Sequence, residues 1–294
     1  MNKKWTSLAL ALALGLSLTA CAGGGNTTQT TPPETTAPAD SAAPMESAAA
    51  DSDLAYVTAN GKLKIGFTYF APMNYIDDNG DFVGFETEFA TAVCEKLGLE
   101  PDFQEINWDS KVMELDSKRI DCIWNGMTIT PALTEALEIG DPYVKNYQVV
   151  VIRSADADKY KTTADLTDAR VEAEAGSAGE AAIIGEDADP NLAQAQYTSV
   201  NKQVDALLEV KAGGADACVL DFVLAGAMVG QGDYSDLMVI PDLQLSVEEY
   251  GVGFRKGSDI APAFNEAMQA LIDDGTLNTI AEKYDLADLL LANQ

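Results

Sequence analysis

The sequence predicts an α/β fold built from two lobes. Short strand patterns alternate with amphipathic helix patterns from residue 62 onward, which is typical of mostly parallel sheets flanked by helices. The same alternation begins again near residue 149, so a second unit of the same kind is expected. Without its N-terminal segment the chain keeps about 240 residues, enough for two small lobes.

Strands and helices of the first half follow from turn signals and periodicity. Residues 62–67 alternate as a strand does, and Asn79-Gly80 marks a turn before a second short strand. Residues 86–97 place apolar side chains on one helical face, and Gly98 ends that helix. Expected next are a strand at 101–105, a helix at 110–115 and a buried strand at 120–124.

The second half repeats these signals. Gly176-Ser177-Ala178-Gly179 precedes a helix, and Asp274-Gly275-Thr276 starts the last one. The remaining elements are expected as strands at 149–152, 170–173, 215–221 and 252–254, and as helices at 200–210 and 260–272.

The N-terminus is typical of a lipoprotein signal peptide, predicted at residues 1–20. Lys3 and Lys4 precede an apolar run at 8–16, which is too short to span a bilayer. Leu18-Thr19-Ala20-Cys21 follows with the spacing of a lipobox, so Cys21 is the expected lipidation site. The alternative is a plain secretory signal with an incidental cysteine.

Residues 21–53 are expected to be a disordered tether, because they are rich in Gly, Thr, Pro, Ser and Ala and carry few groups that could form a core. One lipid on Cys21 would hold the protein at the membrane surface without spanning it. We therefore expect an extracytoplasmic protein anchored to the cell membrane.

Composition excludes several classes of function. The chain has 47 acidic and 18 basic residues, which opposes nucleic-acid binding. This charge indicates either a solvated acidic surface or a cleft that attracts cations. There is no histidine, so Ser-His-Asp and Cys-His catalysis and imidazole metal sites are excluded. Cys94, Cys122 and Cys218 are interpreted as small buried side chains, with one accidental disulfide as the alternative; no cofactor or metal is expected.

The order of short motifs between residues 63 and 284 resembles the type II periplasmic solute-binding proteins, in particular the amino-acid-binding family 3 of ABC importers. Each motif is weak by itself, and the resemblance depends on their order and spacing. The motifs are Ala71-Pro72-Met73, Asn79-Gly80, Val83-Gly84-Phe85-Glu86, Trp108-Asp109, the run 120–130, Asp141-Pro142-Tyr143, Ala164-Asp165-Leu166, Ala175-Gly176-Ser177, Ala215-Asp216-Ala217, Asp221, Tyr250-Gly251-Val252-Gly253 and Asp274-Gly275-Thr276.

This resemblance implies two lobes joined by a two-stranded hinge, with residues 54–147 and 248–294 in lobe I and 148–247 in lobe II. A small polar ligand would bind in the cleft between them, and only contacts made in the closed form could drive closure. An ABC permease would be the protein partner. The protein is expected to be a monomer and not an enzyme.

The family's ligand contacts map onto a small set of positions. The resemblance implies that Phe70 stacks on the ligand with Tyr75 nearby, and that Asp221 holds the ligand's amino group. Other implied contacts are Asn125, Gly126 and Thr128 after the buried strand, and Ser177 and Ala178 at a helix start. The alternatives are that Phe70 belongs to the core and that Asp221 is a helix N-cap.

One position departs from the family pattern. The family usually has an arginine three residues after the Thr-Ile-Thr stretch, where it binds the ligand α-carboxylate with two hydrogen bonds. This chain has Leu133 there. We therefore expect a ligand with a cationic or amine group and no α-carboxylate at that place, with Trp124 offering a further ring face. Alternatively, Trp124 is core, and the backbone at 176–178 or a lysine from elsewhere replaces the arginine.

Two other functions stay open from the sequence. A few proteins on this scaffold are enzymes, such as the cyclohexadienyl dehydratases, which use a cleft carboxylate as acid or base. A ligand sensor that serves a signalling partner is the other alternative. A neighbouring permease gene would favour import, and a neighbouring histidine kinase gene would favour sensing.

Overall fold

The computed structural model describes residues 52–294. The predicted signal peptide, Cys21 and nearly all of the predicted tether lie outside these residues. Ser52 and Asp53, which the sequence placed in the tether, belong to the fold instead. Ser52 caps helix α1 (Asp53–Asn60) by accepting a hydrogen bond from the backbone N–H of Ala55. The fold therefore includes the last two residues of the predicted tether.

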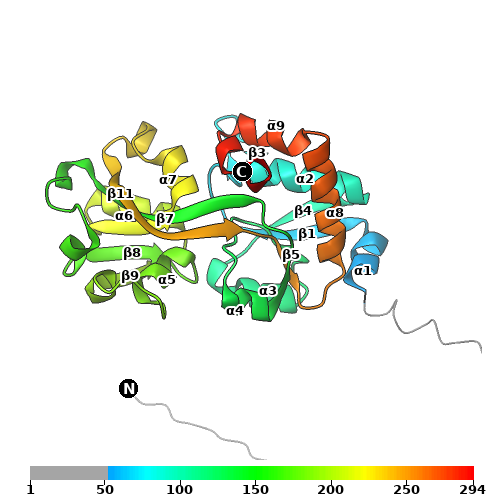
Figure 1. Cartoon of the computed structure of the whole chain (residues 1–294), viewed down its shortest axis with the longest axis horizontal. Helices are drawn as coiled ribbons and strands as arrows, with labels where there is room; N and C mark the ends of the chain where they lie inside the picture. The colour runs from blue at the N-terminus through cyan, green and yellow to red at the C-terminus, as the bar shows by residue number, and fades with distance from the viewer. Residues whose placement is uncertain (1–51) are drawn as a thin grey trace, which may run out of the picture. The chain divides into compact units, whose positions relative to one another are not determined.

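A five-stranded sheet forms the centre of lobe I. Its order is β4 (Glu100–Glu105), β1 (Lys62–Phe67), β5 (Cys122–Ile123), β12 (Gly253–Arg255) and β6 (Leu137–Ile139). β1 runs parallel to both neighbours, and β12 runs antiparallel to both of its own. Its helices are α1, α2 (Phe85–Leu97), α3 (Lys111–Asp116), α4 (Pro131–Ala136), α8 (Ile260–Asp273) and α9 (Thr276–Lys283) (Figure 1).

A second five-stranded sheet forms lobe II. Its order is β11 (Leu237–Tyr250), β7 (Val144–Arg153), β10 (Ala217–Asp221), β8 (Arg170–Glu174) and β9 (Gln196–Val200). β10, β8 and β9 are parallel, and β7 is antiparallel to β10 and β11. Its helices are α5 (Ala178–Ile184), α6 (Gln203–Ala212) and α7 (Phe222–Met228). The predicted two-lobed α/β fold is confirmed.

Two long strands connect the lobes. β7 leaves lobe I and β11 returns to it, and the two strands run side by side between the sheets (Figure 1). They pair from Val144 with Tyr250 to Arg153 with Leu237, with two irregularities in register between Val239 and Val247. These strands lie where the family resemblance placed the hinge. The residue limits proposed for each lobe stay a prediction.

Several predicted boundaries were wrong. The helix expected at 200–210 begins at Gln203, because Val200 is the last residue of β9 and pairs with Glu174. Strand β9 and the short helices α4 and α7 were not expected from the sequence. The remaining short elements are β2 (Tyr75–Ile76), β3 (Phe82–Val83) and the 3-10 turns Trp108–Ser110, Ser154–Asp156, Thr163–Leu166, Leu192–Gln194, Gly232–Tyr234, Ala287–Leu289 and Leu291–Asn293.

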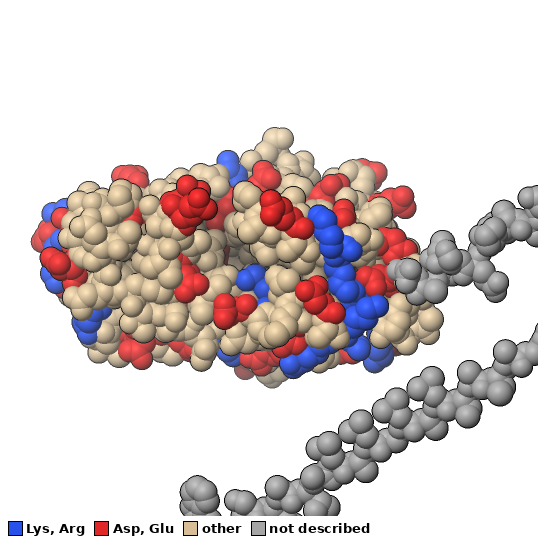
Figure 2. Space-filling view, turned by 90° about the horizontal axis from the view of Figure 1, so that it is seen from below, with Lys and Arg blue, Asp and Glu red and all other residues tan. Residues whose placement is uncertain are grey.

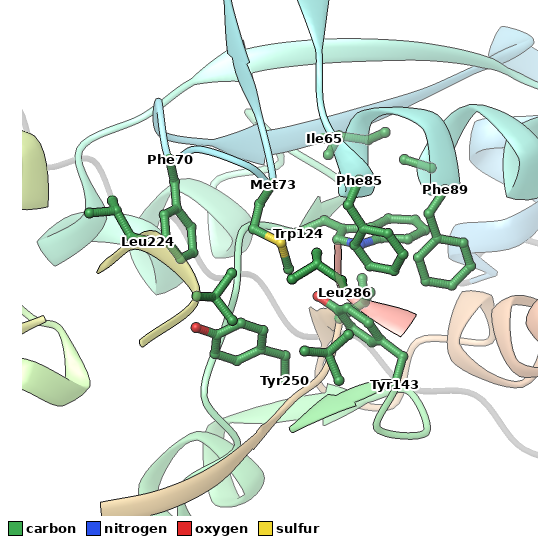
Figure 3. Close-up of a cluster of buried hydrophobic side chains, with 14 of the residues drawn as sticks. Ile65, Phe70, Met73, Phe85, Phe89, Trp124, Tyr143, Leu224, Tyr250 and Leu286 are labelled. Atoms are coloured by element: carbon green, nitrogen blue, oxygen red, sulfur yellow. The ribbon is translucent and has the colours of Figure 1, made fainter. Parts of the chain in front are cut away.

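An aromatic cluster fills the core of lobe I beside the hinge (Figure 3). The Phe89 ring lies 5.0 Å from the Trp124 ring and 6.1 Å from the Phe264 ring, measured between centroids. The Phe89–Trp124 pair is edge-to-face, a geometry that adds to the stabilisation from apolar burial. Cys94, Cys122 and Cys218 are buried free thiols, as expected for small core side chains.

Between residues 52 and 294, no helix combines the length and apolar character needed to cross a membrane. The same part of the chain contains no cluster of Cys, Asp and Glu side chains arranged to hold a metal ion.

Candidate ligand-binding site

A cavity of about 450 Å³ lies between the two lobes. Lobe I contributes the segment after β1, the loop after β5 and the starts of α3 and α4. Lobe II contributes the ends of β8 and β10 and the starts of α5 and α6. The predicted contacts that line this cavity are Phe70, Asn125, Gly126, Thr128, Leu133, Ser177, Ala178 and Asp221.

Phe70 lies at the border between the cavity and the core. Its side chain is buried and belongs to the same cluster as Leu224 and Tyr250, near which Figure 3 draws it. Gly126 allows this placement, because a Cβ atom at Gly126 would lie 2.4 Å from Phe70 Cε1. Gly126 also has a φ of +54°, which disfavours any side chain. Phe70 therefore packs in the core and also forms part of the cavity wall.

Asn125 mainly holds the protein together. Its Oδ1 accepts hydrogen bonds from Thr68 N at 2.9 Å and Thr68 Oγ1 at 2.6 Å, and its Nδ2 donates to Thr68 O at 3.0 Å. These bonds join the ends of β1 and β5. One amide hydrogen of Asn125 remains for a ligand. The hydroxyl of Thr128 forms no hydrogen bond within residues 52–294, so it is the freer donor.

The start of α5 offers few donors to a ligand. Ser177 Oγ accepts from Glu180 N at 3.1 Å, and Gly176 N donates to Glu180 Oε2 at 2.7 Å. Ser177 N donates to the backbone oxygen of Glu174 at 3.2 Å. Protein groups thus occupy two backbone N–H groups that the sequence analysis offered to a ligand carboxylate, which leaves Ala178 N.

Asp221 lies at the end of β10, and its side chain makes no capping bond to α7. Its Oδ1 accepts from Asn146 Nδ2 at 2.6 Å, Gln148 Nε2 at 2.8 Å and the Tyr250 hydroxyl at 2.8 Å. Gln203 Nε2 donates to the other oxygen. Neutral donors from β7, β11 and α6 therefore fix the carboxylate at the cavity. Asp221 occupies the N-cap position of α7, as the alternative interpretation had it, but without a capping bond from its side chain.

Glu248 lies behind Asp221 and shares two of its donors. Asn146 Nδ2 and Gln148 Nε2 donate to Glu248 Oε1 at 2.5 and 2.7 Å. Burial and the charge of Asp221 raise the pKa of Glu248 to about 8. Glu248 is therefore mostly protonated at neutral pH.

Leu133 gives the cavity no donor where the family usually has an arginine. It lies in the first turn of α4, where its backbone N–H donates to Thr130 Oγ1 at 3.2 Å. The cation that lines the cavity is instead Lys111, on α3. Its Nζ donates to Gly176 O at 2.8 Å and Trp108 O at 3.2 Å, and lies 4.7 Å from the centre of the Trp108 ring. Two of its three hydrogens are therefore used by carbonyls.

Trp124 and Tyr75 do not line this cavity, which corrects two predicted contacts. Trp124 is buried in the core, with its ring 5.0 Å from Phe89 and 5.1 Å from Phe264. Tyr75 packs edge-to-face against Tyr284 at 6.5 Å and lines a second cavity, of about 370 Å³, beside α7. Trp124 was expected to contact the ligand because of its position in the strand, and Tyr75 because it is close to Phe70 in sequence. The packing of both side chains keeps them away from this cavity.

Comparison with known proteins fits this arrangement. Residues 63–287 match the family model of the bacterial extracellular solute-binding proteins, family 3. The chain belongs to this family. The resemblance inferred from the motifs is thereby confirmed, and family 3 proteins act outside the cytoplasm.

Family 3 relatives of this chain are amino-acid-binding proteins. The L-cystine-binding protein TcyJ of Escherichia coli is 28% identical over 235 residues, covering 79% of this chain and 86% of TcyJ. The arginine-binding extracellular protein ArtP of Bacillus subtilis is 27% identical over 216 residues, covering 73% and 82%. An ABC uptake transporter substrate-binding protein from Streptococcus pneumoniae, solved with bound histidine, is 29% identical with a TM-score of 0.73, covering 82% and 99%.

Glu174 is a cavity residue that was not expected from the sequence. It is the last residue of β8 and only 4% exposed. Burial and the charge of Asp221 raise its pKa to about 8, against the opposing effects of Lys111 and Gln203. A glutamate at the end of a predicted strand was the available signal, but the alternation in that strand did not show which face would be buried.

The rest of the acidic surface has a simpler interpretation. Figure 2 shows acidic side chains scattered over both halves of the face that it views, rather than gathered in one patch. This pattern agrees with a solvated acidic surface. The cavity also has more acidic than basic groups, since Glu174, Glu180 and Asp221 line it together with Lys111. That the cavity attracts cations stays a prediction.

Proposed function

We propose that this protein is the membrane-anchored solute-binding component of an ABC importer, and that it binds a solute with a cationic amine or guanidine group and no free α-carboxylate. One observation carries the second part of this proposal: an ordered, buried Asp221 lines a cavity in which Leu133 replaces the family's arginine. Asp221 would bind the cationic group of the solute.

The donors around Asp221 support this role. Asn146, Gln148, Gln203 and Tyr250 orient the carboxylate without neutralising it, because all four are uncharged. A buried carboxylate with no cationic partner costs several kcal/mol, so the site gains stability when a cation arrives. A protonated amine or guanidinium of the solute supplies that partner.

The surroundings of Leu133 argue against an α-carboxylate. A solute carboxylate there would be buried without the bidentate guanidinium that usually stabilises it. Gly176 N–H is already bound to Glu180, and two hydrogens of Lys111 are bound to carbonyl oxygens. The cavity therefore holds few free donors for a second anion.

Contacts between the two lobes support capture by lobe closure. Lys111 of lobe I donates to Gly176 O of lobe II, and Lys202 of lobe II pairs with Glu105 of lobe I at 2.6 Å. Contacts of this kind exist only when the lobes are close together, so they favour the closed state. We propose that the solute adds its own contacts to both lobes and completes this closure.

The solute class is tested by a thermal-shift screen of the mature, tag-free protein with amino acids, amines, betaines and small peptides. A ligand that binds only the folded state raises the melting temperature by mass action. We expect amines and guanidines to raise the melting temperature of the wild-type protein. They should not raise that of Asp221→Asn. The melting temperature of this variant without ligand shows whether it folds. Shifts from amino acids alone would contradict the proposal.

Membrane anchoring and transport are tested separately. Cys21→Ser should move the protein from the membrane fraction to the soluble extracytoplasmic fraction, because the lipid attachment site is lost. Solute recovered unchanged after incubation with the protein would agree with binding alone. A converted solute would instead favour an enzyme that uses Glu174 as its acid.

A further inference from the structure

Glu174 is a buried acidic side chain for which amine binding at Asp221 provides no role. It is 4% exposed, lines the cavity, and its Oε1 has no hydrogen-bond partner within residues 52–294. Buried carboxylate oxygens are nearly always hydrogen-bonded, since an unpaired one costs free energy. Because the Glu174 side chain lines the ligand cavity, a ligand can supply the partner that its buried oxygen lacks within residues 52–294.

The other charged groups of the cavity already have partners. Asp221 accepts from four side chains. Glu180 accepts from Tyr197 and from the backbone of Gly176. Lys111 donates to two backbone carbonyls and forms no ion pair with Glu174 in the described part of the chain. Glu174 is therefore the group with unused capacity for a cation.

On the basis of the proposed function, we propose that Glu174 is a second cation-binding group and that the solute is a dication. Such a solute has two cationic ends joined by a short apolar spacer, as in α,ω-diamines and aminoalkylguanidines. Asp221 binds one end and Glu174 the other. Phe70, Leu133, Ala181 and Ile184 line the cavity and contact the spacer. With all of them ionised, three lining carboxylates and one lysine leave an excess of two negative charges, which a dication neutralises.

Binding is coupled to release of a proton. Burial and the charges of Asp221 and Asp205 raise the pKa of Glu174 to about 8, while Lys111 and Gln203 act in the opposite direction. Without solute, Glu174 is thus mostly protonated at pH 7. A cationic end favours the ionised form, so Glu174 gives its proton to solvent on binding, and affinity rises with pH until Glu174 is already ionised in the free protein.

The test is isothermal titration calorimetry with putrescine, n-butylamine and agmatine. Putrescine and butylamine share a four-carbon chain and differ in the second amine. The wild-type protein is expected to bind putrescine at least about tenfold more tightly than butylamine, a difference of about 1.4 kcal/mol. Titrations in two buffers of different ionisation enthalpy should show a proton released with putrescine and none with butylamine.

Glu174→Gln keeps the shape of the side chain and removes its charge. It should lower putrescine affinity about tenfold, leave butylamine affinity within about twofold, and abolish proton release. Glu172→Gln is the matched control, because Glu172 is a partly buried carboxylate on the same strand that does not line the cavity. This control should bind all three compounds as wild type does.

The outcomes separate this inference from the proposed function. If wild type binds putrescine and butylamine equally, or Glu174→Gln binds putrescine as wild type does, Glu174 is not a cation site while amine capture stands. If none of the three compounds binds, amine capture itself is wrong. The comparison of two ligands on the wild-type protein needs no variant, so a folding defect in Glu174→Gln does not prevent a decision.

Discussion

The Tyr250 hydroxyl donates a 2.8 Å hydrogen bond to Asp221 Oδ1 and thereby ties the carboxylate at the cavity to the hinge. Tyr250 is the last residue of β11, and it also forms an isolated bridge with Thr128 in the loop after β5. Three parts of the site, the hinge, the loop and the carboxylate, thus meet at one residue. The position of Asp221 therefore depends on the hinge.

Tyr250→Phe tests this dependence. The substitution removes one hydrogen bond to a buried carboxylate, which should lower the free energy of unfolding by about 1.5 to 3 kcal/mol. Amine affinity should fall several-fold, because Asp221 loses its orientation toward the cavity. Urea denaturation measures the first effect and calorimetry the second. Unchanged amine binding in a destabilised protein would mean that the hinge contact does not position Asp221.

Gly126→Ala tests the contact between the loop and the Phe70 ring. The new Cβ would lie 2.4 Å from Phe70 Cε1 and would be strained at a φ of +54°. We expect loss of stability together with loss of ligand binding. Gly80→Ala is the control. Gly80 also has a positive φ, +88°, but no atom lies within 4 Å of the position that a Cβ would take. This substitution therefore introduces backbone strain without a steric clash. Equal effects of the two substitutions on binding would show that Phe70 does not need this space.

Leu133→Arg tests whether the absent guanidinium excludes α-carboxylates. An arginine at this position of the cavity wall could bind a carboxylate with two hydrogen bonds. The variant should gain at least about tenfold in affinity for L-arginine relative to agmatine, which lacks the carboxylate. Leu133→Gln, which is polar but neutral, should gain much less. No change in the preference for agmatine would place carboxylate discrimination elsewhere in the cavity.

The pH dependence of stability tests two of the three buried glutamates with raised pKa values; the third is Glu86, whose pKa burial raises to about 7. The pKa values of Glu174 and Glu248 lie at about 8 in the folded protein, above the ordinary value of 4.5. Between these values the folded state holds more protons than the unfolded state, so stability without ligand should fall as pH rises from 5 to 8. Urea midpoints across this range measure the slope. Glu174→Gln should flatten it, and a slope unchanged by this substitution would contradict the raised pKa.

The sequence predicted regular elements better than the roles of single polar residues. Strand β1 was predicted with the bounds Lys62–Phe67 that it has, because the alternation of its side chains is a local signal. Asn125 lines the cavity as the resemblance implied, but its bonding to Thr68 depends on two strands that are distant in sequence. No local pattern shows such a partner.

The roles of Glu174 and Lys111 could not be predicted from the sequence either. Neither belongs to a motif, and both appeared to be ordinary charged residues near the ends of a strand and a helix. Their burial results from the approach of α3 to the loop before α5, where Lys111 contacts Gly176. A contact between lobes is a property of the tertiary structure, which periodicity within one segment cannot predict.

The most direct measurement is calorimetric titration of the mature wild-type protein with agmatine and with L-arginine under identical conditions. The two compounds share the guanidinium and carbon chain, and L-arginine adds the α-carboxylate. With Asp221 as the cation-binding group and Leu133 in place of an arginine, agmatine should bind at least about tenfold more tightly than L-arginine. Micromolar or tighter binding of L-arginine, with agmatine equal or weaker, would contradict the account.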